Sequence, residues 1–241
     1  ASSIYIINDY IDIEADRKHP IKRRRPLASG AISKSVARLV FVGLLCLIAG
    51  LVCIGFCCLE HTDWRFVAII VSYFIMNLAY TFKLKHIAII DISIIALGFV
   101  LRVLAGGYAT GIIISQWAIL LTFVLALVLA IGKRRGELIN AQLTGKTRRA
   151  LDGYNVQFAD IALSVSVTLG IISYLMFTIT PEVQERFGQK VFYTFIFVVF
   201  AFLRYLQQTL VYNRTESPTK IIYRDRYIQL TLLLWILCFL L

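Results

Sequence analysis

The chain has 241 residues, of which 59% are apolar and 16% are charged, and its mean hydropathy is +0.77. This composition excludes an ordinary soluble globular domain and indicates an integral membrane protein. The net charge of +11 does not require a nucleic-acid partner, because the positive-inside rule accounts for many bases in so apolar a chain.

Apolar runs long enough to cross the hydrocarbon core recur along the chain, with short polar connections between them. They predict seven membrane-spanning helices, at residues 36–58, 64–82, 87–109, 114–132, 158–180, 190–212 and 225–241. No linker interrupts the series, so residues 1–241 are expected to form a single transmembrane helical domain. Residues 1–8 are too short to cross and are expected to be the tail of a helix whose beginning is missing.

The connections between these helices alternate between base-rich and base-poor. The base-rich ones contain residues 17–38, 83–85, 133–149 and 214–226. The opposite connections hold only Arg65, Arg186 and Lys190. The positive-inside rule therefore predicts that the base-rich side faces the cytoplasm.

An acidic cluster opens the chain, in the stretch "IINDYIDIEADRKHPIKRRRP". At 100° per residue, Asp9, Asp12 and Asp16 point from one helix face, with Asn8 at its edge. Like charges arranged in this way repel one another unless a cation neutralises them. Oxygen ligands favour a hard ion such as Mg²⁺, which shares its remaining coordination positions with substrate phosphates.

Bases follow these carboxylates within a few residues, among them Lys22 and Arg25. A metal and cations that face one pocket describe a polyphosphate site. Two other interpretations remain open from the residues alone. One is a solvated helix end, and the other is the sodium or proton site of an ion-coupled transporter.

The spacing N-D-x-x-D-x-x-x-D in "NDYIDIEAD" resembles the UbiA superfamily of intramembrane prenyltransferases. This resemblance implies an all-α fold, a polytopic bundle of nine transmembrane helices around a central cavity. The chain would then lack the first helix of the bundle and most of the second.

A second aspartate-rich motif of UbiA prenyltransferases is replaced in this chain. The matching place reads "AIGKRRGELINAQLTGKTRRALDGY", where Lys133, Arg134 and Glu137 stand in the place of two aspartates. Fewer metals and more fixed positive charge indicate a ligand with additional phosphates. Four blocks resemble the decaprenyl-phosphate phosphoribosyltransferase branch of the superfamily: "NDYIDIEADRKHPIKRRRPLASG", "AYTFKLKHIAIIDISIIALGFVLRVLAGG", "GKRRGEL" and "YRDRYIQL".

The resemblance to this branch implies Mg²⁺-dependent transfer of 5-phosphoribose from phosphoribosyl diphosphate to a polyprenyl phosphate of the decaprenyl type, with release of pyrophosphate. The implied catalytic residues are Asp9, Asp12, Lys133, Arg134 and Glu137, and the implied metal ligands are Asp9, Asp12 and Asp16. The implied substrate-binding residues are Asn8, Arg17, Lys22, Arg25, Tyr80, Lys83, Lys85, Arg149 and Tyr154. It also implies a bacterial inner-membrane enzyme of cell-wall biosynthesis with a cytoplasmic active site, and it leaves a homo-oligomer open.

Alternative readings remain for this function and for single residues. A UbiA-type aromatic prenyltransferase that uses a polyprenyl diphosphate is the first alternative, and an ion-coupled transporter is the second. Tyr80 and Tyr154 could bind substrate or belong to an interfacial aromatic belt. Glu137 could hold Lys133 or Arg134 in position, since all three lie within one helical turn.

An aspartate and an arginine share one predicted span, at positions 91 and 102. They lie eleven residues apart, which corresponds to roughly 16 Å along a helix, so they cannot pair directly. Arg102 should then need another carboxylate, carbonyl groups or a cavity, and a structural clamp is its expected role.

Overall fold

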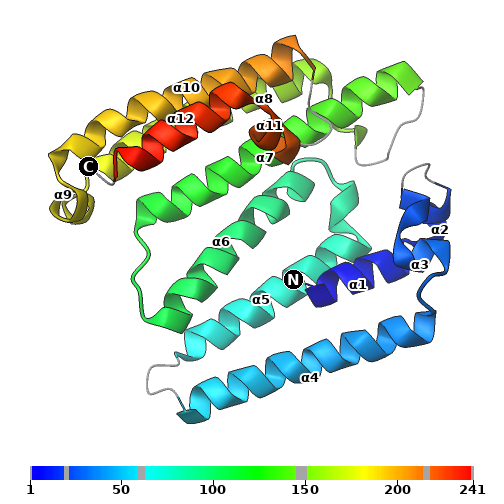
Figure 1. Cartoon of the computed structure of the whole chain (residues 1–241). Helices are drawn as coiled ribbons and strands as arrows, with labels where there is room; N and C mark the ends of the chain where they lie inside the picture. Colours follow the sequence, from blue (N-terminus) through cyan, green and yellow to red (C-terminus); the bar gives the residue numbers. More distant parts are fainter. Residues whose placement is uncertain (1, 19–21, 59–62, 145–150, 214–217, 240–241) are drawn as a thin grey trace. The chain divides into compact units, whose positions relative to one another are not determined.

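The computed structural model describes residues 2–18, 22–58, 63–144, 151–213 and 218–239 (Figure 1). All regular elements in these segments are helices, which confirms the predicted all-α class. The chain divides into two compact units, which are described separately below. Unit 1 is Ala1–Leu84 with Ala105–Ile113, and unit 2 is Lys85–Leu104 with Ile114–Leu241.

Membrane-spanning candidates are numerous among the described residues. Six helices are long and apolar enough to cross a membrane: Lys34–Gly55, Trp64–Phe82, Ile90–Thr110, Gln116–Gln142, Val156–Thr178 and Gln189–Val211. The seventh predicted span contains the shorter apolar helix Arg226–Leu237, which is about 18 Å long and falls short of the roughly 30 Å core. The protein is therefore an integral membrane protein with a polytopic helical fold.

Unit 1 is built from helices of very different lengths. They are α1 (Ser2–Ile11), α2 (Ile13–Arg17), η1 (Lys22–Arg24), α3 (Pro26–Ser29), α4 (Lys34–Cys58) and α5 (Trp64–Phe82). Helix α1 packs against α4 and α5, while α2, η1 and α3 pack on one another. The buried apolar cluster here is small and consists of Ile13, Leu27 and Ala37. Unit 1 thus leaves most of its apolar helix surface exposed, as lipid-facing helices do.

Unit 2 contains most of the long helices. Its first elements are η2 (Leu84–His86) and α6 (Ile90–Thr110), each with an end in unit 1. They are followed by α7 (Gln116–Thr144), α8 (Val156–Thr178), α9 (Pro181–Phe187), η4 (Gln189–Thr194), α10 (Phe195–Leu206), η5 (Gln207–Val211), α11 (Pro218–Arg224) and α12 (Arg226–Leu237). Helix α7 packs along α8, and α10 packs against α8 and runs beside α12 (Figure 1).

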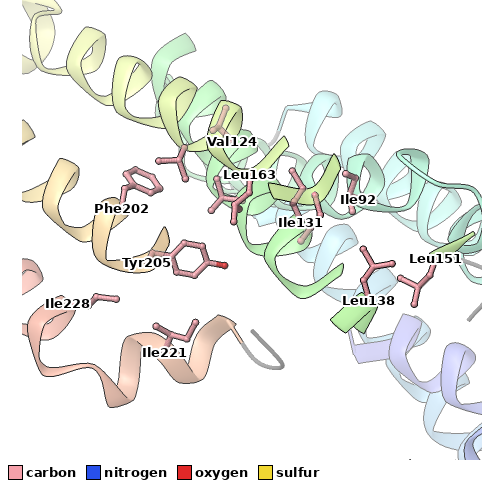
Figure 2. Close-up of a cluster of buried hydrophobic side chains, with 14 of the residues drawn as sticks. Ile92, Val124, Ile131, Leu138, Leu151, Leu163, Phe202, Tyr205, Ile221 and Ile228 are labelled. Carbon is pink, nitrogen blue, oxygen red and sulfur yellow. The ribbon is translucent and has the colours of Figure 1, made fainter. Parts of the chain in front are cut away.

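The core of unit 2 is centred on one face of α7 (Figure 2). Val124, Ile131 and Leu138 follow one another at seven-residue spacing, and Leu163 of α8 is fully buried against this cluster. Lipid is as apolar as leucine, so such helices associate through close packing and polar contacts. Gly132 permits this packing, because a Cβ at that position would lie 2.3 Å from the Tyr205 hydroxyl oxygen of α10.

Helix α7 extends beyond the predicted end of its span. The sequence places that end at residue 132, where the charges begin, whereas the helix continues to Thr144. The charged segment stays helical because Arg134 pairs with Glu137 one turn away, and because carboxylates of other elements bind its buried arginines. The "GKRRGEL" stretch is therefore part of a long helix.

Candidate active site

The acidic cluster of unit 1 gathers around the guanidinium of Arg25. Its Nη1 donates to Asp9 Oδ1 at 2.7 Å and to Asp16 Oδ2 at 2.9 Å. The Lys22 Nζ lies 4.0 Å from Asp16 Oδ1. The structure thus brings together two of the three predicted metal ligands and two of the predicted phosphate-binding bases.

Local backbone geometry explains why these side chains meet. Asp12 lies at the junction of α1 and α2, with φ −87° and ψ 5°, yet its N–H still bonds the Asn8 carbonyl. The helical course continues, so Asp9 and Asp16 stay on one face at seven-residue spacing. Arg25 is the N-cap residue of α3, ahead of Pro26, and the turn through η1 returns its side chain to the carboxylates.

The electrostatics of this cluster favour additional positive charge. Burial raises the pKa of the Asp9 carboxyl, the Arg25 charge opposes this effect, and the nearby carboxylates of Asp16 and Asp12 increase it. The ionised form of Asp9 is therefore costly mainly because the carboxyl is partly buried, and a further cation beside it would stabilise that form.

A metal ion would have two convergent carboxylates here. Within the described segments, no three His, Cys, Asp or Glu side chains gather closely enough to form a metal site. Asp9 and Asp16 nevertheless both reach one atom, the Nη1 of Arg25, so the guanidinium takes the place of a shared cation. An all-oxygen pair of this kind fits a hard divalent ion that keeps waters or phosphate oxygens as its other ligands.

Residues 133–137 form the second candidate region, in unit 2. Lys133 is exposed on α7, whereas the next residue, Arg134, is buried. Arg134 Nε donates to Asp91 Oδ2 of α6 at 2.6 Å, and its Nη1 donates to Glu137. Glu137 thus pairs with one of the two bases that the sequence offered as partners.

Tyr154 completes this region from the segment before α8. Its hydroxyl donates to Asp91 Oδ1 at 2.7 Å and accepts the Ile89 N–H at 2.6 Å. Burial raises the pKa of the Tyr154 hydroxyl far above its usual range, and the hydrogen bond to Asp91 adds to the effect. Tyr154 therefore remains a protonated donor to the carboxylate.

Asp91 is the residue that sequence reasoning missed. From the sequence, Asp91 is weighed only against Arg102, whereas the structure gives Asp91 an ion pair with Arg134. The signal was present, because a carboxylate in the first turn of a membrane-spanning helix needs a partner. Arg102 itself is exposed, with its guanidinium carbon 5.3 Å from the centre of the Phe99 ring.

A second buried arginine of α7 was also missed. Arg135 Nε donates to Asp160 Oδ1 of α8, and its Nη1 donates to the Thr209 carbonyl at 2.6 Å and to Asn213 Oδ1 at 2.9 Å. Thr209 lies in the π-helix η5, where the altered hydrogen-bond register frees carbonyl groups. Arg135 therefore joins α7, α8 and the end of α10.

In the stretch "YRDRYIQL", the residue with the most contacts to other elements is Asp225. This carboxylate caps α12 by accepting the N–H groups of Tyr227 and Ile228, and it also accepts hydrogen bonds from Arg204 and Gln208 of the preceding helical segment. Burial alone would raise the pKa of Asp225, but these donors outweigh it and lower the pKa. The stretch joins α12 to α10 in unit 2.

The other predicted binding residues are distributed over several elements. Asn8 and Tyr80 are half-buried on α1 and α5, and Lys83 is an exposed residue at the end of α5. The Nε of Arg17 donates to the Ala28 carbonyl at 3.1 Å, which fastens α2 to α3. Lys85 lies in η2, while Arg149 lies outside the described residues.

Comparison with known proteins places the chain in a family. The UbiA prenyltransferase family matches residues 1–230, so the chain belongs to this family of intramembrane transferases. The chain is 33% identical to the decaprenyl-phosphate phosphoribosyltransferase of Corynebacterium glutamicum, over 99% of this chain and 70% of that protein. It is 34% identical to the protein of the same name from Mycolicibacterium smegmatis, over 98% of this chain and 74% of that protein.

A more distant relative is named for a different activity. The digeranylgeranylglyceryl phosphate synthase of Sulfolobus acidocaldarius is 27% identical over 91% of this chain and 74% of that protein. Together, these similarities confirm the resemblance to the UbiA superfamily and the expectation of a transferase.

Proposed function

We propose that the protein transfers 5-phosphoribose from phosphoribosyl diphosphate to a polyprenyl phosphate of the decaprenyl type and releases pyrophosphate. The observation that carries this proposal is that residues 133–137 contain bases in place of metal-binding aspartates. Where the resemblance leads one to expect aspartates that bind a second metal, α7 carries an exposed lysine and a buried arginine. The names of the two relatives that are 33% and 34% identical to this chain support the same activity.

Counting phosphate groups explains why bases suit this position. Phosphoribosyl diphosphate carries a diphosphate at C1 and a phosphate at C5, and the lipid acceptor brings one more phosphate. We assign the diphosphate to the carboxylates Asp9, Asp12 and Asp16 acting through a divalent ion. The remaining phosphates fall to bases, for which the candidates are Lys22, Arg25, Lys83, Lys85, Lys133 and Arg134.

Mg²⁺ is the ion that best suits the oxygen-only ligands, and when bound it would stabilise the charge that develops on the leaving diphosphate. Asp9 and Asp16 would hold it, since their carboxylates already converge on one cationic group. Arg25 and Lys22 lie beside these carboxylates, where they are candidates to bind a further phosphate of the substrates.

The reaction needs little proton transfer. An oxygen of the lipid phosphate attacks C1 of the ribose, the bond from C1 to the diphosphate oxygen breaks, and pyrophosphate leaves with the bonding electrons. The configuration at C1 inverts through an oxocarbenium-like transition state. The acceptor phosphate is already ionised near neutral pH, so no strong general base is required of the protein.

The base-rich ends of the helices suggest where this reaction takes place. The start of α6, the charged part of α7 and the segment before α8 meet in unit 2 through Asp91, Arg134 and Tyr154. All three segments lie at base-rich connections, which the positive-inside rule assigns to the cytoplasm. We therefore place the active site at the cytoplasmic face of a bacterial inner membrane, in cell-wall biosynthesis.

The test is a transfer assay with the purified full chain in lipid nanodiscs. Phosphoribosyl diphosphate labelled in the ribose, decaprenyl phosphate and Mg²⁺ should yield label that is extracted with the lipid. Parallel reactions contain a labelled polyprenyl diphosphate with an aromatic acceptor. If label reaches product only in the reactions with the polyprenyl diphosphate, and none is transferred from phosphoribosyl diphosphate to the lipid, the proposal is overturned in favour of prenyl transfer.

A further inference from the structure

One continuous chain of hydrogen bonds joins α6, the charged part of α7 and the segment before α8 in unit 2. The Ile89 N–H donates to the Tyr154 hydroxyl at 2.6 Å, and this hydroxyl donates to Asp91 Oδ1 at 2.7 Å. The second oxygen of Asp91 accepts Arg134 Nε at 2.6 Å, and Arg134 also donates to Glu137. The bonded residues come from the segment before α6, from α6, from α7 and from the segment before α8.

Burial makes this network costly to assemble and costly to disturb. Asp91 is 0% exposed and Arg134 is 6% exposed, so both charges have left water. Buried charges of this kind are tolerated only when their partners satisfy them fully. The charge of Arg134 is engaged by two carboxylates, which favours a role in holding neighbouring groups over direct contact with a phosphate.

The backbone at Ile89 is strained and needs this support. Its φ is +68°, in the left-handed region that β-branched residues rarely adopt. The Tyr154 hydroxyl accepts the N–H of this same residue. Gly153 adds a second contact, because a Cβ there would lie 2.4 Å from the Ala88 Cβ. Residues 153–154 thus clamp residues 88–89 in one conformation.

We propose that Asp91 and Tyr154 are positioning residues that fix two base-bearing segments for phosphate binding. One segment is η2, which carries Lys85 and ends just before the strained turn. The other is the charged part of α7, where Lys133 adjoins Arg134. This inference rests on the proposed function for the identity of the donor, and it gives Tyr154 a role different from direct contact with substrate.

A positioning role and a purely structural role predict different kinetics. If the network only stabilises unit 2, its loss lowers thermal stability and leaves the remaining folded enzyme kinetically normal. If it holds the bases in place, its loss raises the KM for the donor in protein that is still folded.

Tyr154→Phe tests this distinction because it keeps the ring and removes only the hydroxyl. The matched control is Tyr174→Phe, on α8 of the same unit. The Tyr174 hydroxyl also makes two side-chain hydrogen bonds, with Thr194 at 2.7 Å and with Trp235 at 2.6 Å, away from the network. Both variants should lose similar thermal stability in nanodiscs.

Only Tyr154→Phe should raise the KM for phosphoribosyl diphosphate, by about tenfold, with kcat changed far less. Asp91→Asn should show the same pattern, because it retains the shape of the side chain and loses the charge that holds Arg134. A KM for Tyr154→Phe equal to that of Tyr174→Phe, at matched stability, would overturn the inference.

The proposed function and this inference fail in different ways. A wild-type protein that does not consume phosphoribosyl diphosphate overturns the proposed function. The positioning role is then decided by the binding of inorganic phosphate to the same variants. About tenfold weaker binding to Tyr154→Phe than to Tyr174→Phe supports the role, and equal binding overturns it.

Discussion

Each unit of the molecule places one arginine between two carboxylates, but the two clusters differ in burial. The Arg25 side chain of unit 1 is 36% exposed, whereas the Arg134 side chain of unit 2 is 8% exposed. Arg25 binds Asp9 and Asp16, which lie 16 and 9 positions away in the sequence. Arg134 binds Glu137 three positions away and Asp91 43 positions away.

This difference in the burial of the two arginines suggests different roles for the two clusters. An ion pair that water reaches is weak, so its cation can be exchanged for a metal or joined by a phosphate. An ion pair that is fully buried opens only at high cost, so it suits the fixing of neighbouring segments. We therefore expect substitutions in unit 1 to act mainly on turnover, and substitutions around Asp91 to act on stability and geometry.

The largest effect is expected from the cluster around Arg25. Asp9→Asn should reduce Mg²⁺-dependent turnover by about a thousandfold, or about 4 kcal/mol, because it removes a ligand from the ion that stabilises the leaving group. The protein should remain folded, since the change also relieves repulsion between carboxylates. Transfer of labelled phosphoribose to lipid is the measurement.

Glu14→Gln is the matched control, because Glu14 is an exposed carboxylate of the same segment. It should retain near-normal turnover. Normal activity and normal Mg²⁺ dependence in Asp9→Asn would show that the metal assignment is wrong.

The buried cluster should respond mainly in stability. Asp91→Ala is expected to destabilise the fold by about 3 kcal/mol, because it leaves part of the Arg134 charge buried without its partner. Unfolding monitored by thermal denaturation in nanodiscs measures the effect. The control is Arg65→Ala, which breaks an exposed pair with Asp63 at 3.7 Å and should cost less than about 1 kcal/mol. Equal costs for the two variants would contradict the distinction between the clusters.

A smaller effect on donor binding is expected at the exposed lysine next to the buried network. Lys133→Ala should weaken the binding of phosphoribosyl diphosphate by about 2 kcal/mol, the loss of one charged hydrogen bond, while Mg²⁺ dependence persists. Arg134→Ala should also weaken binding and should reduce stability as well. Lys190→Ala, in a predicted base-poor connection, is the control for binding measured by titration. If Lys133→Ala binds phosphoribosyl diphosphate as tightly as the wild type, this lysine serves only to orient the chain in the membrane under the positive-inside rule.

The smallest effect is expected from substitutions that report only the membrane orientation. In a background without the native cysteines, Ser29→Cys and Glu185→Cys change exposed residues and should leave activity intact. Ser29→Cys should react with a membrane-impermeant reagent from the cytoplasmic side, and Glu185→Cys from the opposite side. Labelling of both from one side would refute the predicted topology.

How far each cluster could be predicted depends on how far apart its residues lie in the sequence. The cluster around Asp9 is built from residues within one short stretch, so helical periodicity was sufficient to place Asp9 and Asp16 on a common face. The same reasoning did not reveal that Arg25 would bind both carboxylates, because the turn through η1 decides where its side chain returns. The apolar run placed the end of α7 too early, since charges that normally end a span are neutralised here by other helices.

The sequence by itself determined the six long membrane-spanning helices of the described residues, the alternation of charged connections and the UbiA motif, since apolar length and residue spacing are local properties. Only the tertiary structure decided the partner of Asp91. Spacing along α6 excluded Arg102, but nothing local could select Arg134 and Tyr154, which lie 43 and 63 positions away. A buried carboxylate must find its donors wherever the packing of helices brings them, and that packing depends on the whole unit.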